Sequence, residues 1–151
     1  LWDVRSGQCL QTLEHRGEPH SVALSPDAKL ALSTGLDRAF WLWDVGEARL
    51  ERTFEGYAEE YVEDAAFSPD GQWVISAGNR ARTVRIWQVS TGLCLRTLKS
   101  HGKRVRVVAF SPDGEWALSA GGEDHDRTVT PDYAIRLWRL VWDYEFPEPA
   151  D

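Results

Sequence analysis

Methionine is absent from this chain of 151 residues, and only two cysteines are present. Without a methionine to start translation, we expect the chain to be a piece of a longer protein. Basic residues are outnumbered, with 17 Lys and Arg against 24 Asp and Glu and a formal net charge of −7. Binding to nucleic acid or to an anionic membrane surface needs clustered positive charge, so we expect neither partner. No apolar run approaches ~18 residues, so we expect no transmembrane helix.

The two cysteines occupy matching places in two similar segments, Cys9 in SGQCLQTL and Cys94 in TGLCLRTL. Matching positions of different repeat units lie at least one sheet spacing of ~10 Å apart. A disulfide needs Cα atoms within ~7 Å. We therefore expect two free, buried thiols. Free thiols are typical of a reducing compartment, and we expect a cytoplasmic location.

A tryptophan recurs along the chain at similar intervals, with spacings of 41, 44 and 51 residues between Trp2, Trp43, Trp87 and Trp138. The last three follow a Ser-Pro-Asp turn, in ALSPDA (23–28), AFSPDG (66–71) and AFSPDG (109–114). No helical periodicity is present, and each unit consists of short segments of period two separated by turn residues. The pattern predicts an all-β chain with four strands per unit. In the second unit we place the strands at 61–67, 72–77, 83–89 and 93–98.

The Ser-Pro-Asp-Gly turn has a physical basis in its sequence. Proline presets φ at the first turn position, aspartate caps the turn, and glycine accepts the left-handed conformation. Ala28 takes the place of that glycine in the first unit. We expect a strain of roughly 1 kcal/mol there.

A four-stranded unit with a Trp-Asp pair near the end of its third strand resembles the WD-repeat β-propeller family, above all the tandem WD-repeat proteins of bacteria. The resemblance implies an incomplete propeller of about three four-stranded antiparallel blades in an open arc. It divides the chain into the end of a preceding blade (1–14), three blades (15–56, 57–98 and 99–146) and an acidic tail (147–151). Residues 9–14 and 142–146 would be outer strands.

The resemblance also implies a buried hydrogen-bonded tetrad in each blade, which links a His, a Ser, an Asp and the third-strand Trp. Two sets fit the pattern: His15, Ser33, Asp37 and Trp43, and His101, Ser119, Asp132 and Trp138. The middle set is incomplete, with Tyr57, Ser76, Ala81 and Trp87. These residue types resemble a catalytic triad, but in the family they are structural. Catalytic motifs are absent from the sequence, so we expect no enzyme activity, no cofactor and no metal.

Residues that depart from the repeat are the candidates for partner binding. Trp41 stands where the other units have arginine, and it either packs between blades or anchors a partner. Two loops of opposite charge, which contain Glu59 and Glu60 and Lys103 and Arg104, either screen each other or form a recognition patch. The insertion 121–131 holds Glu123, Asp124, His125 and Asp126. It is either a solvated acidic loop or a contact for a partner or metal.

These observations predict a non-catalytic scaffold for protein–protein interaction. Its partners would be other proteins and either the remaining blades of the same chain or further copies, which would pack on the exposed blade faces. Two alternatives stay open. The first is a sensor module fused to a signalling enzyme, such as a kinase or a nucleotide-binding switch protein. The second is a metal-dependent enzyme that uses the 121–131 loop.

Overall fold

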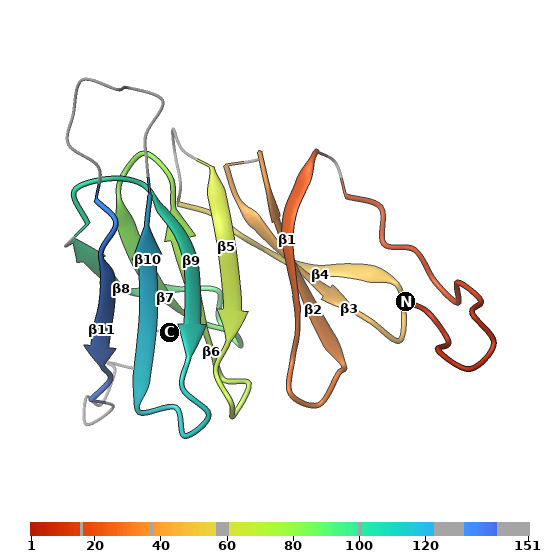
Figure 1. The fold of residues 1–151 in the computed structure, drawn as a ribbon. Helices are drawn as coiled ribbons and strands as arrows, with labels where there is room; N and C mark the ends of the chain where they lie inside the picture. The colour runs from red at the N-terminus through yellow and green to blue at the C-terminus, as the bar shows by residue number, and fades with distance from the viewer. Residues whose placement is uncertain (16, 37, 57–60, 100, 123–131, 142–151) are drawn as a thin grey trace, which may run out of the picture.

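The protein folds into three antiparallel sheets that stand side by side in an open arc (Figure 1). The computed structural model describes residues 1–15, 17–36, 38–56, 61–99, 101–122 and 132–141, and no helix occurs among them. The first sheet contains β1 (Pro19–Leu24), β2 (Leu30–Gly35), β3 (Phe40–Asp44) and β4 (Arg49–Phe54). The second contains β5 (Val62–Phe67), β6 (Trp73–Gly78), β7 (Thr83–Gln88) and β8 (Cys94–Lys99). The third contains β9 (Val105–Phe110), β10 (Trp116–Gly121) and β11 (Ile135–Arg139).

The predicted all-β class is confirmed, and so are the four strands of the second unit, each to within one residue at either end. Every sheet is a simple meander, because each strand pairs with the next along the chain. The inner strands β1, β5 and β9 contact one another in succession from sheet to sheet. All chain reversals therefore fall on two rims, and the loops before β1, β5 and β9 share a rim with those before β3, β7 and β11.

The three Ser-Pro-Asp turns have one hydrogen-bond pattern. In the first, Ser25 Oγ donates to Asp27 Oδ1 at 2.7 Å and accepts from the Leu30 amide at 2.9 Å. The Ser68 and Ser111 hydroxyls bond in the same way to Asp70 and Asp113. The residue after Asp is left-handed in every turn, with φ of 58° at Ala28, 71° at Gly71 and 72° at Gly114. The strain expected at Ala28 is therefore present in the backbone.

Replacing Ala28 with glycine should stabilise the protein by about 1 kcal/mol, because an L side chain at positive φ is disfavoured. The measurement is the free energy of unfolding in urea. Gly71→Ala and Gly114→Ala are matched controls. The free energy of unfolding of both variants should fall by a similar amount because of backbone strain alone. An added Cβ would meet a proline ring at an ordinary 3.6 Å, so it adds no steric clash. A destabilised Ala28→Gly variant would contradict this account.

The hydrophobic cores lie between sheets, not within them. The first joins the first two sheets through Leu32, Phe40, Leu42, Phe54, Val62, Ala65, Val74 and Trp87. Here Phe40 and Phe54 stack at 4.3 Å between ring centroids, and both meet the Trp87 ring edge-on. The second core joins the second and third sheets through Ile75, Ala77, Val84, Val105, Val108 and Ala117. Each sheet is thus held mainly by its neighbours.

The third sheet leaves exposed the face that the second sheet buries. Val84 and Ile86 on β7 are 0% and 5% exposed, whereas the matching Ile135 and Leu137 on β11 are 73% and 60% exposed. The repeat supplies the same apolar pattern in both sheets, but in the described structure only the second has a neighbour on that side. The arc therefore ends in an apolar face.

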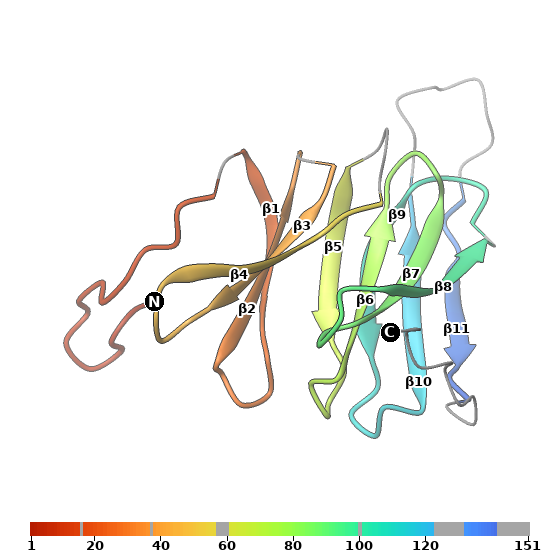
Figure 2. The same cartoon turned by 180° about the vertical axis from the view of Figure 1, so that it is seen from behind.

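Residues 1–15 form an arm at the opposite end of the arc, beside the first sheet (Figures 1 and 2). The outer strand predicted at residues 9–14 is not formed. Its one ladder contact is an isolated bridge between Trp2 and Cys9, because only the short LWDV segment lies beside it. An apolar groove of about 500 Å³ lies between the arm and the first sheet. On the side of the arm it is lined by Leu1, Gln11 and Leu13. The other predicted outer strand, 142–146, lies outside the described residues.

Candidate functional site

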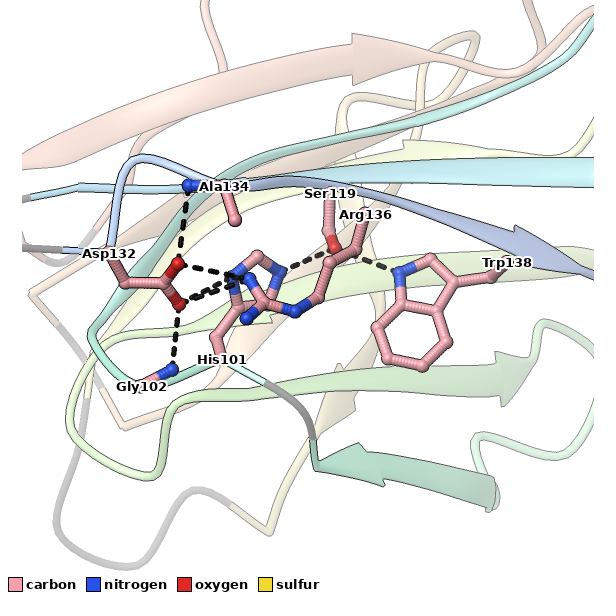
Figure 3. Close-up of polar contacts among 7 residues, drawn as sticks. All are labelled: His101, Gly102, Ser119, Asp132, Ala134, Arg136 and Trp138. Atoms are coloured by element: carbon pink, nitrogen blue, oxygen red, sulfur yellow. Dashed lines mark hydrogen bonds and ion pairs between the residues drawn. The ribbon is translucent and has the colours of Figure 1, made fainter.

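The third sheet brings His101, Ser119, Asp132 and Trp138 into one hydrogen-bonded group (Figure 3). His101 precedes β9, Ser119 lies on β10, and Asp132 and Trp138 come from the loop before β11 and from β11 itself. The Trp138 indole N–H donates to Ser119 Oγ at 2.8 Å, and His101 Nε2 lies 2.7 Å from the same oxygen. The histidine and serine are 7% and 1% exposed, so the group is closed to solvent at this end.

Arg136 stands between the aspartate and the histidine, which the sequence did not indicate. Its Nη1 donates to Asp132 Oδ2 at 3.0 Å and lies 2.7 Å from His101 Nδ1. A guanidinium can only donate, so Nδ1 accepts from Arg136 when it is unprotonated, and it donates to Asp132 Oδ2, 3.4 Å away, when it carries the proton. Ser119 Oγ accepts from the indole and shares a second hydrogen bond with His101 Nε2.

The electrostatics of the group favour an ionised Asp132 and a neutral His101. Burial alone would raise the pKa of Asp132, but the Gly102 amide at 2.7 Å, the Arg136 guanidinium and the Ala134 amide together lower it to about 2. Burial lowers the pKa of His101 below its ordinary value, and the charge of Arg136 adds to this, against the opposing effect of Asp132. The aspartate thus faces its donors as an anion, and the imidazole stays uncharged.

Both shifts predict loss of stability in acid. A histidine with a lowered pKa stabilises the fold fully above its unfolded value of 6.5 and loses that contribution as the pH falls below it. Ionised Asp132 stabilises the fold fully above its unfolded pKa of 3.8. At most about 2 kcal/mol of this stabilisation is lost as the pH falls towards 2. The free energy of unfolding in urea should therefore fall in two stages below pH 6.5. In a His101→Gln variant the first stage should be smaller; an unchanged profile would contradict the assignment.

The strand that carries the serine, β2 or β10, ends in a glycine at the point where the histidine ring approaches the backbone. A Cβ built on Gly121 would lie 2.7 Å from the Asp132 carbonyl oxygen and 2.9 Å from His101 Nδ1. At the matching Gly35, a Cβ would collide with the Glu18 carbonyl and lie 3.2 Å from His15 Cε1. In both sheets the histidine thus occupies space that a larger residue would take.

In the first sheet the structure shows part of the expected tetrad. The Trp43 indole donates to Ser33 Oγ at 2.8 Å. The His15 ring stacks on Trp41, with centroids 4.4 Å apart. Asp37 lies outside the described residues, so the complete first tetrad stays a prediction.

The middle sheet keeps the serine–tryptophan bond without the rest of the pattern. Trp87 donates to Ser76 Oγ at 2.7 Å. Ala81 is exposed, and Tyr57 lies outside the described residues. Arg85, in the position of Arg136, donates to the Gly56 carbonyl at 2.6 Å. The serine–tryptophan bond is thus the element common to all three sheets.

Trp41 is not an exposed anchor. The side chain is 8% exposed, and besides His15 it contacts Trp43 with ring centroids 5.5 Å apart. Of the two interpretations left open above, packing is the one that agrees with this burial. The packing shown is within the first sheet.

The basic pair predicted on the rim does not present two free charges. Lys103 is 1% exposed, and its prediction as a surface binding residue is wrong in this structure. The backbone on both sides of Lys103 is fixed by hydrogen bonds. The Gly102 amide donates to Asp132, and the Arg104 carbonyl accepts from the Gly122 amide. Arg104 Nη1 lies 3.8 Å from Glu63 Oε1, so this arginine is partly neutralised by the neighbouring sheet. The remaining candidates, Glu59, Glu60, Glu123, Asp124, His125 and Asp126, lie outside the described residues.

Asp64 on β5 links all three sheets, a role that the sequence did not reveal. Ser21 of β1 donates to its Oδ1 at 2.6 Å, and the Val108 amide of β9 donates to its Oδ2 at 3.0 Å. The adjacent Glu63 lies 4.0 Å from His20 Nδ1 as well as 3.8 Å from Arg104. In the sequence, Asp64 stands out only as part of the acidic segment 55–64. Its hydrogen-bond partners, Ser21 and Val108, come from the other two repeats and are not apparent from that segment.

Both cysteines are free, as expected, but both are exposed, and the prediction that they are buried is wrong. Cys94 begins the outer strand β8, where no further strand covers it. Its thiol donates to the Arg96 carbonyl at 3.5 Å, and the Cys9 thiol makes the matching contact with Gln11 at 3.6 Å. The two segments therefore share local geometry as well as sequence.

No group of three or more His, Cys, Asp or Glu side chains is placed to hold a metal ion in the part of the chain that the structure describes. The candidate metal residues of the 121–131 insertion, Glu123, Asp124, His125 and Asp126, all lie outside that part. Among the described residues, no helix is long and apolar enough to cross a membrane.

Comparison with known proteins agrees with the repeat and the sheets. The family model described as WD40, WD domain, G-beta repeat, matches residues 7–44, 48–88 and 92–130. These matches cover most of the chain, which therefore belongs to the WD40 repeat family.

Curated relatives are similar at low identity and are much longer. Nuclear distribution protein PAC1 of Arthroderma otae is 27% identical over 162 residues, which cover 93% of this chain and 33% of the relative. GID complex subunit 7 of Schizosaccharomyces pombe is 25% identical, covering 91% of this chain and 26% of the relative. The p21-activated protein kinase-interacting protein 1-like of Danio rerio is 24% identical, covering 93% and 46%. The chain thus spans between about a quarter and a third of the length of these fungal relatives.

Proposed function

We propose that this chain is a non-catalytic scaffold for protein–protein interaction and part of a larger WD-repeat propeller. The family match supports this, as do the names of two relatives, one a subunit of a complex and the other a kinase-interacting protein. Because the chain spans a fraction of those relatives, partners of the whole protein are part of the proposal. Its division into blades at residues 15–56, 57–98 and 99–146 belongs to it too.

The observation that carries the proposal is the state of the serine in the third sheet. A nucleophilic serine needs a neighbouring base to accept its proton. Here Ser119 Oγ already accepts from the Trp138 indole, and His101 is held at Nδ1 by Arg136 and Asp132. Ser119 is also 1% exposed. The residues that resemble a catalytic triad are therefore arranged to hold the sheet together.

The rim that carries the histidine loops offers a surface suited to a protein partner. Leu36, Tyr61 and Tyr133 are 41%, 37% and 69% exposed in these loops. The exposed Arg38 and Arg80 lie on the same rim. Tyrosine and arginine are enriched among the residues that dominate binding energy at protein interfaces. The sequence did not indicate these residues, because residue type alone does not determine which aromatic side chains are exposed.

The test is affinity capture of the tagged chain from a lysate of its source organism, with quantitative mass spectrometry. A triple variant, Leu36→Ala, Tyr61→Ala and Tyr133→Ala, should lose specifically captured proteins by about tenfold, the effect of ~1.4 kcal/mol. The matched control is Leu50→Ala with Leu93→Ala, two exposed leucines that the strand directions place on the other rim. Equal losses in both variants would contradict the proposed surface.

The named relatives come from fungi and zebrafish and lend no support to a bacterial origin. A cytoplasmic location rests on the free cysteines alone. Deletion of residues 121–131 should leave folding intact and reduce capture if that insertion contacts a partner.

A further inference from the structure

Lys103 carries a buried amine that the proposed function does not use. Of the lysines in the chain, Lys29 and Lys99 are exposed, whereas Lys103 is 1% exposed. Its Nζ has no hydrogen-bond partner and no ion pair in the part of the chain that the structure describes. Lysine is almost never fully buried without a partner, because the amine then loses its hydration and gains no compensating contact. Burial of this side chain therefore costs free energy in the closed form of the segment that contains it.

The repeat itself does not require a lysine at this place. Gly17 follows His15 in the first unit at the same distance as Lys103 follows His101 in the third. Both positions precede an inner strand, β1 or β9. The glycine has no side chain to bury, so the buried amine distinguishes the third sheet from the first.

In the described structure, two hydrogen bonds hold the backbone next to Lys103. The exposed Gly102 donates its amide to Asp132 Oδ2 at 2.7 Å (Figure 3). The Arg104 carbonyl accepts from the Gly122 amide at 3.2 Å. Beyond Arg104, β9 is paired with β10 along its length. Breaking these two bonds is therefore enough to free residues next to Lys103 while the sheet stays paired.

We infer that residues 102–104 open locally and place the Lys103 amine in water, while His101 and Val105 keep their positions. In the closed state the segment makes two hydrogen bonds and buries an unpartnered amine. In the open state water hydrates the amine and replaces both bonds. Segments held by few buried contacts open at a much lower free energy than the whole fold. The third sheet thus has a built-in conformational switch on the rim of the histidine loops.

The opening gives this rim two states. Asp132 loses the Gly102 donor in the open state, and the next residue is Tyr133, which belongs to the surface proposed above for partner binding. A partner that binds one state better than the other shifts the equilibrium towards that state. This use of the opening rests on the proposed function, whereas the opening itself does not.

Hydrogen exchange of the Gly102 and Gly122 amides, followed by NMR, tests the opening. Lys103→Met keeps the length of the side chain and removes the amine, so both amides should exchange at least about tenfold more slowly. Lys99→Met is the matched control, because it removes an exposed amine close by in the sequence, and it should change exchange by less than about twofold. Exchange in Lys103→Met as fast as in the native sequence overturns the inference. Equal slowing in Lys99→Met does so as well.

A second measurement needs no variant. Local opening exposes little surface, so exchange of the Gly102 and Gly122 amides should stay constant as urea is raised below the unfolding transition. Acetylation of the Lys103 amine by acetic anhydride, followed by mass spectrometry, should be equally independent of urea. If both amides and the amine react faster with the urea dependence of global unfolding, the segment does not open by itself and the inference fails. Neither measurement involves a partner, so failure to capture one leaves this result unaffected.

Discussion

Replacing Asp132 with alanine should destabilise the protein by about 3 kcal/mol, one of the two largest effects expected from a single polar side chain here. The change removes the acceptor of the Gly102 and Ala134 amides and of Arg136, and it leaves the guanidinium without its counter-charge. Hydrogen bonds to charged groups contribute ~1.5–3 kcal/mol each, and leaving one partner of such a pair alone adds to the loss. Urea unfolding followed by tryptophan fluorescence measures the effect.

The middle sheet supplies the control for this prediction. Ala81 occupies the matching place in the second unit and is exposed, so Ala81→Ser should change stability by less than about 0.5 kcal/mol. Asp132→Asn is the intermediate case, since an amide keeps one acceptor but not the charge. If Asp132→Ala were as mild as Ala81→Ser, the hydrogen-bonded group would be dispensable to the fold.

Replacing Asp64 with alanine should cost about 3 kcal/mol and should loosen the contacts between sheets more than any sheet itself. Its two oxygens accept from Ser21 of the first sheet and from Val108 of the third, at 2.6 and 3.0 Å. Two charge-assisted bonds of ~1.5 kcal/mol or more set the size of the effect. Hydrogen exchange should report faster exchange of the Val108 amide, with the β6–β7 ladder protected.

Two further variants separate the contributions at Asp64. Ser21→Ala removes only the bond to the first sheet and should cost about half as much. Asp64→Asn keeps one acceptor and should fall between the two. Stability equal to wild type in Asp64→Ala would show that apolar packing alone joins the sheets.

The strands were predictable from the sequence because their signal is local. In the second unit, alternation and turn residues were enough to place each strand end to within one residue. The backbone strain at Ala28 was predictable for the same reason, since a left-handed turn position needs glycine whatever surrounds it.

What the sequence missed depends on contacts between repeats or on burial. Asp64 looks like one of many acidic residues until Ser21 and Val108 are brought to it from other repeats. The place of Arg136 between Asp132 and His101 follows from the geometry of the folded sheet, which its position in the repeat does not reveal. Lys103 and Cys94 were assigned to the wrong environment because residue type alone does not determine burial.

The placement of both cores between sheets has a consequence for how such a chain grows. Duplicating an internal unit adds one more interface of the same kind and leaves the two ends unchanged, so no new complementarity has to evolve. Energetically the molecule behaves as a one-dimensional array, in which each unit is coupled only to its nearest neighbours. Of the three sheets, the second alone is covered on both faces by described neighbours. Fraying should therefore begin at the termini of the array and reach the second sheet last.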